Sequence, residues 1–375
     1  MTREQICASA SAKLHKAEPT LNTIPALIGL DGFVDEIVAV VDKRTGLHDY
    51  VPVKTIAHLA EKIHKASGQS SNYELIVKQM KLGGNGPIMA NALASAGLAV
   101  TYIGNLGYPS LHSVFEPFAK RANVISIAEP GHTDALEFDD GKLMLGKIEP
   151  VKDINWDNLL GRVGQTKLET LFGQSVLVGM VNWTMLPFMS EIWAKLMTDV
   201  LPKLPKQKRT LFVDLADPEK RLHEDIAQAM KLLTEFQKQI DVILGLNLKE
   251  STEILAVLDL PTPADPEAEI QRSAAAIRQK LGIGCVVIHP RRGAAAATAE
   301  TNAAFAGPFV QQPKISTGAG DHFNAGFCLG RILGMDLAES LCIGVATSGY
   351  YVRNAASPTA AELADFVSHL PPPQA

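Results

Sequence analysis

The sequence lacks the features that define several large classes of protein. Its four cysteines (Cys7, Cys285, Cys328 and Cys342) are scattered rather than spaced as a disulfide framework, and three lie in apolar segments, so we expect reduced thiols. Its ten histidines do not cluster at the spacing of metal ligands. A net charge of −5, with acids and bases interspersed, provides no broad basic surface for nucleic acid or an anionic membrane.

The chain also lacks long apolar runs. No stretch approaches the roughly 20 apolar residues of a membrane span. The first residues, MTREQICASASAKLHKAEP, lack the apolar region of a signal peptide. We therefore expect a cytoplasmic protein without a membrane partner. With 375 residues, 46% of them hydrophobic, the chain has enough material for a sizeable core.

Short apolar segments alternate with helical segments through much of the chain, which predicts an α/β fold. Near-continuous apolar strands of this kind favour a parallel sheet covered by helices on both faces. We interpret residues 1–375 as one domain. The predicted strands lie at 25–30, 99–107, 175–181, 210–216, 241–247 and 285–290.

Two segments interrupt this alternation. Residues 36–56 and about 130–149 each resemble a hairpin, with turn-forming residues at 43–46 and 139–141. Because neither segment fits the βα pattern, we predict that together they form a small β-lid beside the main sheet.

The stretch Gly318-Ala319-Gly320-Asp321 precedes a predicted helix. Glycines let the backbone turn tightly and let another molecule approach closely. The unpaired N–H groups and the dipole of a helix N-terminus attract anions. Asp321 at this position is therefore either a helix cap or a catalytic group.

The segment STGAGDHFNAG resembles the C-terminal signature of the ribokinase/PfkB carbohydrate kinases, DTxGAGDxFxxG, although Ser316 stands where the family often has Asp. Residues 83–107 resemble the N-terminal signature, and residues 247–250 (NLKE) fit the family's NxxE motif. The order and spacing of the three motifs agree with the family over roughly residues 25–357. The resemblance implies a ribokinase-like fold, namely a central, mostly parallel sheet with helices on both faces and a small β-lid.

The resemblance also implies a reaction. It predicts an ATP-dependent, Mg²⁺-dependent kinase that phosphorylates a hydroxymethyl group of a sugar or related polyol. Asp321 would accept the hydroxyl proton, and the N–H groups of Gly318, Ala319, Gly320 and Asp321 would hold charge on the transferred phosphoryl group. We expect the helix dipole to keep Asp321 ionised at neutral pH.

The remaining motifs carry predicted binding roles. By resemblance, Asn247 and Glu250 order Mg²⁺ near the phosphates, Glu250 indirectly through water, although Asn-x-x-Glu is also the pattern of a helix capping box. Asn354 matches a region that lines the nucleotide pocket. Asn182 and Asp214 follow or end predicted strands, where open α/β sheets bind ligands.

The predicted substrate residues lie near the N-terminus. Gly83 and Gly84 would let the backbone approach the substrate hydroxyls, and Asn85 is a candidate contact, although the family usually has Asn near the position of Ile88. Asp35 would accept hydrogen bonds from sugar hydroxyls. Asp31, followed by glycine, is expected to form a turn and is a second candidate ligand.

Three alternatives remain open at this stage. A nucleoside kinase on the same fold is one, because adenosine also presents a ribose hydroxymethyl group. A catalytically silent sugar sensor is another, disfavoured by the intact Asp321. An ADP-dependent sugar kinase would share the Gly-Gly-Asn segment. A nicotinamide-dependent oxidoreductase is disfavoured because no GxGxxG follows the first strand.

The edge strands of the lid could also pair two subunits in a homodimer.

Overall fold

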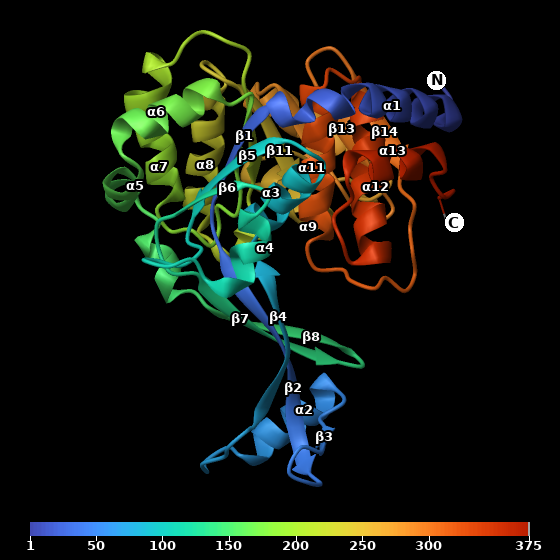
Figure 1. Cartoon of the computed structure of the whole chain (residues 1–375). Coiled ribbons are helices and arrows are strands. Elements are labelled where there is room, and N and C mark those ends of the chain that lie inside the picture. Colours follow the sequence, from blue (N-terminus) through green and yellow to red (C-terminus); the bar gives the residue numbers. More distant parts are fainter. Residues whose placement is uncertain (374–375) are drawn as a thin grey trace.

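A nine-stranded sheet forms the centre of the computed structural model, which describes residues 1–373 (Figure 1). Neighbouring strands from β12 to β6 are parallel, and the edge strands β13 and β14 run antiparallel. In spatial order the strands are β14 (Asn302–Ala306), β13 (Gly293–Ala297), β12 (Cys285–Ile288), β11 (Asp241–Leu246), β10 (Thr210–Asp214), β9 (Leu177–Met180), β1 (Pro25–Leu30), β5 (Ala99–Gly104) and β6 (Asn123–Ser126).

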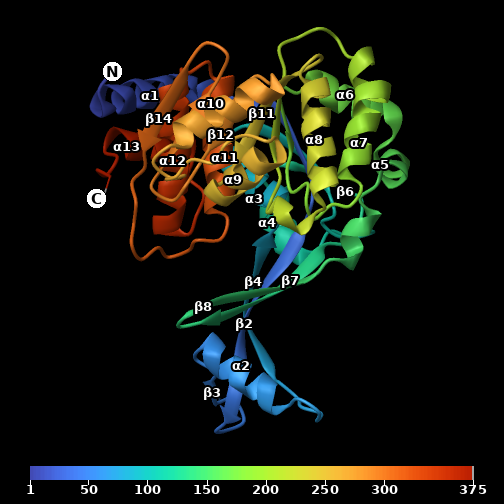
Figure 2. The same cartoon turned by 180° about the vertical axis from the view of Figure 1, so that it is seen from behind.

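Helices cover both faces of this sheet (Figure 1 and Figure 2). Alternate residues of β10 point to opposite faces, so that Leu211 and Val213 join one apolar core while Phe212 joins the other. The first core is closed by α5 (Trp156–Val163), α6 (Gln165–Gln174), α7 (Met189–Lys195), α8 (His223–Phe236), α9 (Leu248–Val257) and α10 (Ile270–Leu281). The second is closed by α1 (Arg3–Ala17), α3 (Asn85–Ser95), α4 (Glu116–Ala119), α11 (Ala319–Ile332), α12 (Leu337–Asn354) and α13 (Ala360–Ser368).

The predicted fold class is confirmed, and each predicted strand contains an observed one. Strands β13 and β14 were not predicted, because their sequences, GAAAA and NAAFA, contain none of the β-branched residues that favour strands. Their extended conformation comes from antiparallel pairing, of β13 with β12 and of β14 with β13. Within the described residues, no helix combines the length and apolar character needed to cross a bilayer.

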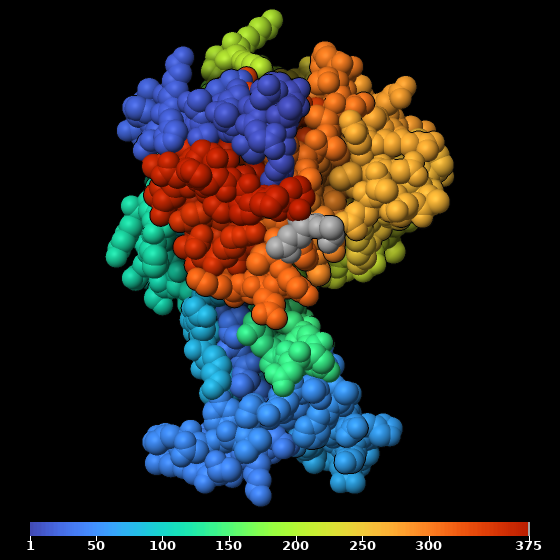
Figure 3. Space-filling view, turned by 90° about the vertical axis from the view of Figure 1, so that its right-hand side faces the viewer, coloured from blue at the N-terminus to red at the C-terminus, as the bar shows by residue number. Residues whose placement is uncertain are grey.

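A second sheet projects from the main body, as Figure 1 and Figure 3 show. The segment 36–56 contains most of β2 (Phe33–Arg44) and β3 (Tyr50–Pro52), and the segment 130–149 contains β7 (Gly131–Phe138) and β8 (Gly141–Lys147). Val38, Val40, Val53, Leu59 and Leu136 form its small apolar core.

The second sheet also contains a segment that we did not predict. Helix α2 (Ile56–Lys65) and strand β4 (Leu75–Gly83) follow the first hairpin, and β4 pairs with β2 along most of its length. The polar residues Lys78, Gln79 and Lys81 interrupt the apolar alternation of β4, so its sequence alone does not indicate a strand. The two-segment prediction therefore omitted a third segment of this sheet.

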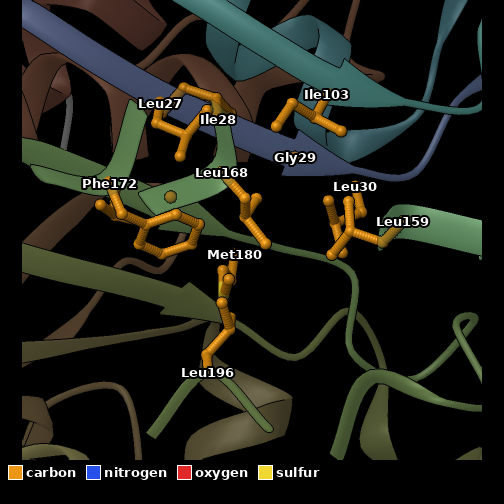
Figure 4. A pocket seen from close by; sticks show the side chains of 12 residues that line it. Leu27, Ile28, Gly29, Leu30, Ile103, Leu159, Leu168, Phe172, Met180 and Leu196 are labelled. Carbon is orange, nitrogen blue, oxygen red and sulfur yellow. The ribbon is translucent and has the colours of Figure 1, made fainter. Parts of the chain in front are cut away.

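A small gap in the main core is seen in Figure 4. It lies between strands β1 and β9 and the neighbouring helices, and its volume is about 10 Å³. Side chains such as Leu27, Leu168, Phe172 and Met180 surround it. A space this small and apolar does not bind a ligand, so we regard it as a packing gap.

Candidate active site

Polar residues stand at the carboxyl ends of the parallel strands. These ends meet at one edge of an open α/β sheet, which is where such sheets bind ligands. The residues that end or follow β1, β9, β10, β11 and β12 are Asp31, Asn182, Asp214, Asn247 and His289.

Two clefts meet at this edge. The first, here called the lid cleft, has a volume of about 820 Å³ and is lined by Asp35 and Thr133 of the second sheet and by Asn182 and Asp321 of the main body. The second, here called the α12 cleft, has a volume of about 660 Å³ and is lined by Phe309 and by residues of α12. The residues that line both are Asn247, His289, Thr317 and Gly320. Molecules bound in the two clefts would therefore meet at the glycine loop.

Asp321 lies in the first turn of α11 and is only 7% exposed. The N-cap residue of this helix is Gly318, in a left-handed conformation with φ of 87°, so the interpretation of Asp321 as the cap is wrong. The carboxylate lines the lid cleft, and its Oδ1 accepts a 2.9 Å hydrogen bond from Nδ2 of Asn85. The structure thus brings together two residues that we predicted from motifs 236 positions apart.

Burial raises the pKa of Asp321 to about 8, and the Asp31 and Glu250 carboxylates add to this, while the Asn85 hydrogen bond lowers it. Our expectation that the helix dipole keeps Asp321 ionised at neutral pH does not agree with this raised pKa. A helix dipole acts mainly on exposed or partly buried groups near its end, whereas full desolvation can shift a carboxyl pKa by several units.

The N–H groups of the glycine loop are not equivalent. The Ala319 N–H donates to the Ser316 carbonyl at 3.2 Å. In the described part of the chain, the N–H groups of Gly318, Gly320 and Asp321 have no backbone acceptor. Three of the four predicted donors are therefore available to a ligand, and Ala319 is engaged within the turn.

Asp31 is fully buried and lies outside both clefts. Its carboxylate accepts hydrogen bonds from the N–H groups of Asn85 and Gly86, at 2.9 and 2.8 Å, and from Nδ2 of Asn182 at 2.7 Å. Burial raises the pKa of Asp31 to about 6. Asp31 therefore holds the start of α3, including Asn85, in position. This buried position does not match our prediction that Asp31 contacts the substrate directly.

Gly84 and Gly83 make room for these two carboxylates. Gly84 precedes α3 with φ of 92°, and a Cβ there would lie 2.8 Å from Oδ2 of Asp31. A Cβ on Gly83 would collide with the carboxylate of Asp35, its diagonal neighbour across the β2–β4 pair. Asp35 is 5% exposed and lines the lid cleft, and burial raises its pKa, partly offset by the Lys81 ammonium. At each of these two positions, a residue larger than glycine would collide with the neighbouring carboxylate.

Asn247 and Glu250 form a complete capping box at the start of α9. Oδ1 of Asn247 accepts from the Glu250 N–H at 3.0 Å, and Oε2 of Glu250 accepts from the Asn247 N–H at 2.8 Å. The other carboxylate oxygen of Glu250 accepts from the N–H of Asp217 at 2.9 Å. Both residues also line the lid cleft, so capping and ligand binding are compatible here.

Asn354 does not join the site. It is exposed, its Nδ2 donates to the Tyr350 carbonyl, and it lines neither cleft. Helix α12 instead faces the α12 cleft with Val345, Gly349 and Val352, which are spaced by three or four residues. Asn354 lies two residues beyond Val352, about 200° around the helix, and points elsewhere.

Several buried polar atoms at the clefts have no hydrogen-bond partner among the described residues. They include Oδ1 of Asn182, Oγ1 of Thr184 and Nε2 of His289. Burial lowers the pKa of His289 to about 4, so its ring is neutral. The sequence analysis assigned no role to Thr184 or His289, although the position of His289 directly after a buried strand was a usable signal.

A parallel sheet with a glycine loop and a buried Asp at its carboxyl edge, together with a small second sheet, is the architecture of the ribokinase-like fold. Solved structures of other proteins share this fold. Ribokinase of Arabidopsis thaliana, complexed with ribose and ATP, has a TM-score of 0.61 at 15% identity, covering 92% of this chain and 98% of that one. Adenosine kinase of Sinorhizobium meliloti has a TM-score of 0.60 at 15% identity, with the same coverage.

The family model for prokaryotic ketohexokinase matches residues 7–370. The chain therefore belongs to the prokaryotic ketohexokinase family and is a carbohydrate kinase, a phosphotransferase with an alcohol acceptor. A ketohexokinase of Haloferax volcanii is 29% identical over 347 residues, which cover 91% of this chain and 90% of the relative. The predicted resemblance to the ribokinase/PfkB kinases is confirmed.

Proposed function

We propose that this protein transfers the γ-phosphoryl group of ATP to a hydroxymethyl group of a ketohexose. One observation carries the proposal: a single loop borders both clefts, with Asp321 lining the lid cleft and Ala319 lining the α12 cleft. Sugar in the first cleft and nucleotide in the second would place acceptor and donor on either side of Gly320. The similarity to ketohexokinases favours a ketohexose as the acceptor.

In the proposed reaction, Asp321 accepts the proton of the attacking hydroxyl. The free N–H groups of Gly318, Gly320 and Asp321, together with the positive end of α11, stabilise negative charge on the phosphoryl group. Phosphoryl transfer passes through a loose transition state, so positioning and charge stabilisation contribute most of the rate enhancement. A base with a pKa near the working pH is well suited to this role.

The lid cleft offers fixed hydrogen-bond acceptors to a sugar. Nδ2 of Asn182 donates to Asp31, which leaves Oδ1 of Asn182 as an acceptor without a partner among the described residues. Asp35 and Thr184 line the same cleft. Sugar hydroxyls would satisfy these buried acceptors, and the apolar side chains of Phe33 and Met144 would limit the access of water.

Mg²⁺ fits the same edge of the sheet. Asp214 and Glu250 are both buried, and burial raises the pKa of Asp214 well above its ordinary value, with the Glu250 and Asp321 carboxylates raising it further. A bound cation reduces the electrostatic repulsion among buried carboxylates that lie this close together. In the proposal Asp214, Asn247 and Glu250 would hold Mg²⁺ through water, in a position where a bound cation would offset the charge of the phosphates.

The direct test is release of ADP from ATP and Mg²⁺ in the presence of ketohexoses, aldohexoses, pentoses and nucleosides, tested separately. We expect the largest kcat/KM with a ketohexose. Preference for adenosine would favour the nucleoside kinase. Tight sugar binding without ADP release would favour the silent sensor, and turnover with ADP as donor would favour the ADP-dependent alternative.

Replacement of Glu250 by Gln is expected to raise the Mg²⁺ concentration needed for half-maximal activity. It should also lower the free energy of unfolding by about 1–3 kcal/mol. The Gln side chain has only one oxygen, so its NH₂ group would face the N–H of Asn247 or of Asp217 and one of the two hydrogen bonds would be lost. Magnesium titrations and thermal unfolding measure both effects. Glu253→Gln, one turn further along α9 and outside the clefts, is the control. Lost stability with an unchanged Mg²⁺ requirement would show that Glu250 only caps.

We also propose a homodimer formed through the second sheet. Within the described residues β4 pairs only with β2, and Leu75, Val77 and Met80 on it are 41%, 49% and 44% exposed. An exposed apolar edge strand favours pairing with another chain. Light scattering during gel filtration should give the mass of a dimer, and Val77→Lys should shift it toward a monomer. Leu222→Lys, an exposed residue of the main body, should leave the mass unchanged.

A further inference from the structure

An aromatic pair packs behind the glycine loop. His322 follows Asp321 on α11, and its ring stacks on that of Tyr351 of α12, with centroids 3.6 Å apart and planes at 13°. His322 is 2% exposed, and neither residue lines the lid cleft or the α12 cleft. The two side chains therefore lie outside the walls of both clefts.

The two side chains hold consecutive carbonyl groups of that loop. The Tyr351 hydroxyl donates to the Thr317 carbonyl at 3.0 Å, and Nδ1 of His322 lies 2.8 Å from the Gly318 carbonyl. A peptide group is planar, so the direction of a carbonyl also sets the opposite direction of the following N–H. The Tyr351 hydrogen bond thereby orients the N–H of Gly318, one of the free donors, and the His322 hydrogen bond fixes the next peptide.

The hydrogen bonds also define the tautomer of His322. A carbonyl only accepts, so Nδ1 carries the proton. In a neutral ring Nε2 is then an acceptor, and the hydroxyl of Ser357, 2.9 Å away, donates to it. Burial lowers the pKa of His322 to about 4, which keeps the ring neutral. Oγ of Ser357 accepts in turn from Nδ2 of Asn91 at 3.2 Å.

This series of hydrogen bonds begins at Asn91 on α3. The first residue of the same helix, Asn85, donates a hydrogen bond to the carboxylate of Asp321. One rigid helix is thus tied to the catalytic turn at two points. Hydrogen bonds run without a break from Asn91 through Ser357 and His322 to the Gly318 carbonyl, so each group orients the next.

We propose that His322 and Tyr351 are positioning residues that hold residues 317–320 in the conformation that receives the transferred phosphoryl group. The proposal rests on the proposed function, in which this loop binds that group. Because neither residue lines the two clefts, the pair should act on turnover rather than on the affinity for sugar or nucleotide.

Tyr351→Phe removes one hydroxyl and keeps the ring that stacks on His322. We expect kcat to fall about 10- to 100-fold, as for a small displacement of a reacting group, with both KM values within about threefold of wild type. Tyr350→Phe is the matched control, because Tyr350 packs on Phe366 of α13, with centroids 5.7 Å apart, and does not contact the loop. It should retain the wild-type kcat. An unchanged kcat in Tyr351→Phe would overturn the proposal.

His322 offers a second pair of variants. His322→Asn keeps a donor near the position of Nδ1 and should retain more turnover than His322→Leu, which has none. If both variants lose kcat equally while remaining folded, the hydrogen bond to Gly318 has no positioning role.

The tautomer can be tested without any assay of activity. In the full-length protein labelled with ¹⁵N-histidine, the His322 signals are assigned by their loss in His322→Asn. We expect Nδ1 protonated and Nε2 unprotonated from about pH 6 to about pH 8. Protonation at Nε2, or titration near the ordinary histidine pKa, would overturn the proposal. The expected tautomer in a protein that phosphorylates no acceptor would support this geometry and contradict the proposed function instead.

Discussion

Replacement of Asp321 by Asn should lower turnover by about 10²- to 10⁴-fold, the range for loss of a positioned general base. Asn keeps the shape of the side chain and an oxygen near the Asn85 amide. The N-cap residue of α11 is Gly318, so no cap is lost. The fold and the affinity for ATP should persist, as measured by thermal unfolding and nucleotide binding. Asp336→Asn, at the N-cap of α12, is the control. Turnover near wild type in Asp321→Asn would contradict the catalytic assignment.

The pH dependence of the same reaction provides an independent test. A base acts when deprotonated, so kcat/KM should rise about tenfold per pH unit below the pKa and level off above it. With the pKa of Asp321 at about 8, the rise should extend through neutral pH, and Asp321→Asn should show no such rise. A wild-type profile that is flat between about pH 6 and about pH 9 would contradict a raised pKa.

The raised pKa also affects stability. The folded protein binds this proton more tightly than the unfolded chain, whose Asp pKa is near 3.8. The stabilising contribution of Asp321 is therefore complete below about pH 3.8, decreases as the pH rises, and is fully lost above about pH 8. Asp321→Asn should thus unfold at a higher temperature than wild type at alkaline pH, and the difference should shrink at acidic pH.

Replacement of Asp35 by Ala should reduce kcat/KM for the sugar by about 10²- to 10³-fold, which corresponds to one or two charge-assisted hydrogen bonds. Asp35 lines the lid cleft and lies beside Gly83. The loss should appear mainly in the KM for sugar, while the KM for ATP stays close to wild type, because Asp35 is absent from the α12 cleft. Steady-state kinetics with each substrate varied in turn measure the separation.

Asp42→Ala is the matched control for this prediction. Asp42 lies on the same strand, β2, and its carboxylate bonds to Lys62 of α2 outside the clefts. It should keep the wild-type kcat/KM. A loss in Asp42→Ala equal to that in Asp35→Ala would indicate general damage to the second sheet rather than lost sugar contacts.

Much of the fold follows from local patterns. Segments such as LFVD and DVILGL are apolar on both faces and sufficient to predict buried parallel strands. Strands β4 and β13 could not be predicted in this way. Their lysines, glutamine and alanines have weak strand propensity, and the strands exist because β2 and β12 offer unpaired backbone groups to them.

For the site, the sequence alone determined which chemical groups are present: a glycine loop at a helix start, an acid beside it, and polar residues after the strands. It could not determine which acid faces a ligand. Asp31 and Asp35 look alike in sequence, yet donors 54, 55 and 151 residues away converge on Asp31 and bury it. Likewise, the sequence showed that a carboxyl group follows the glycine loop, whereas the raised pKa of Asp321 results from its burial in the tertiary structure. Desolvation depends on every atom packed around a carboxylate, and those atoms come from distant segments that the folded chain alone brings together.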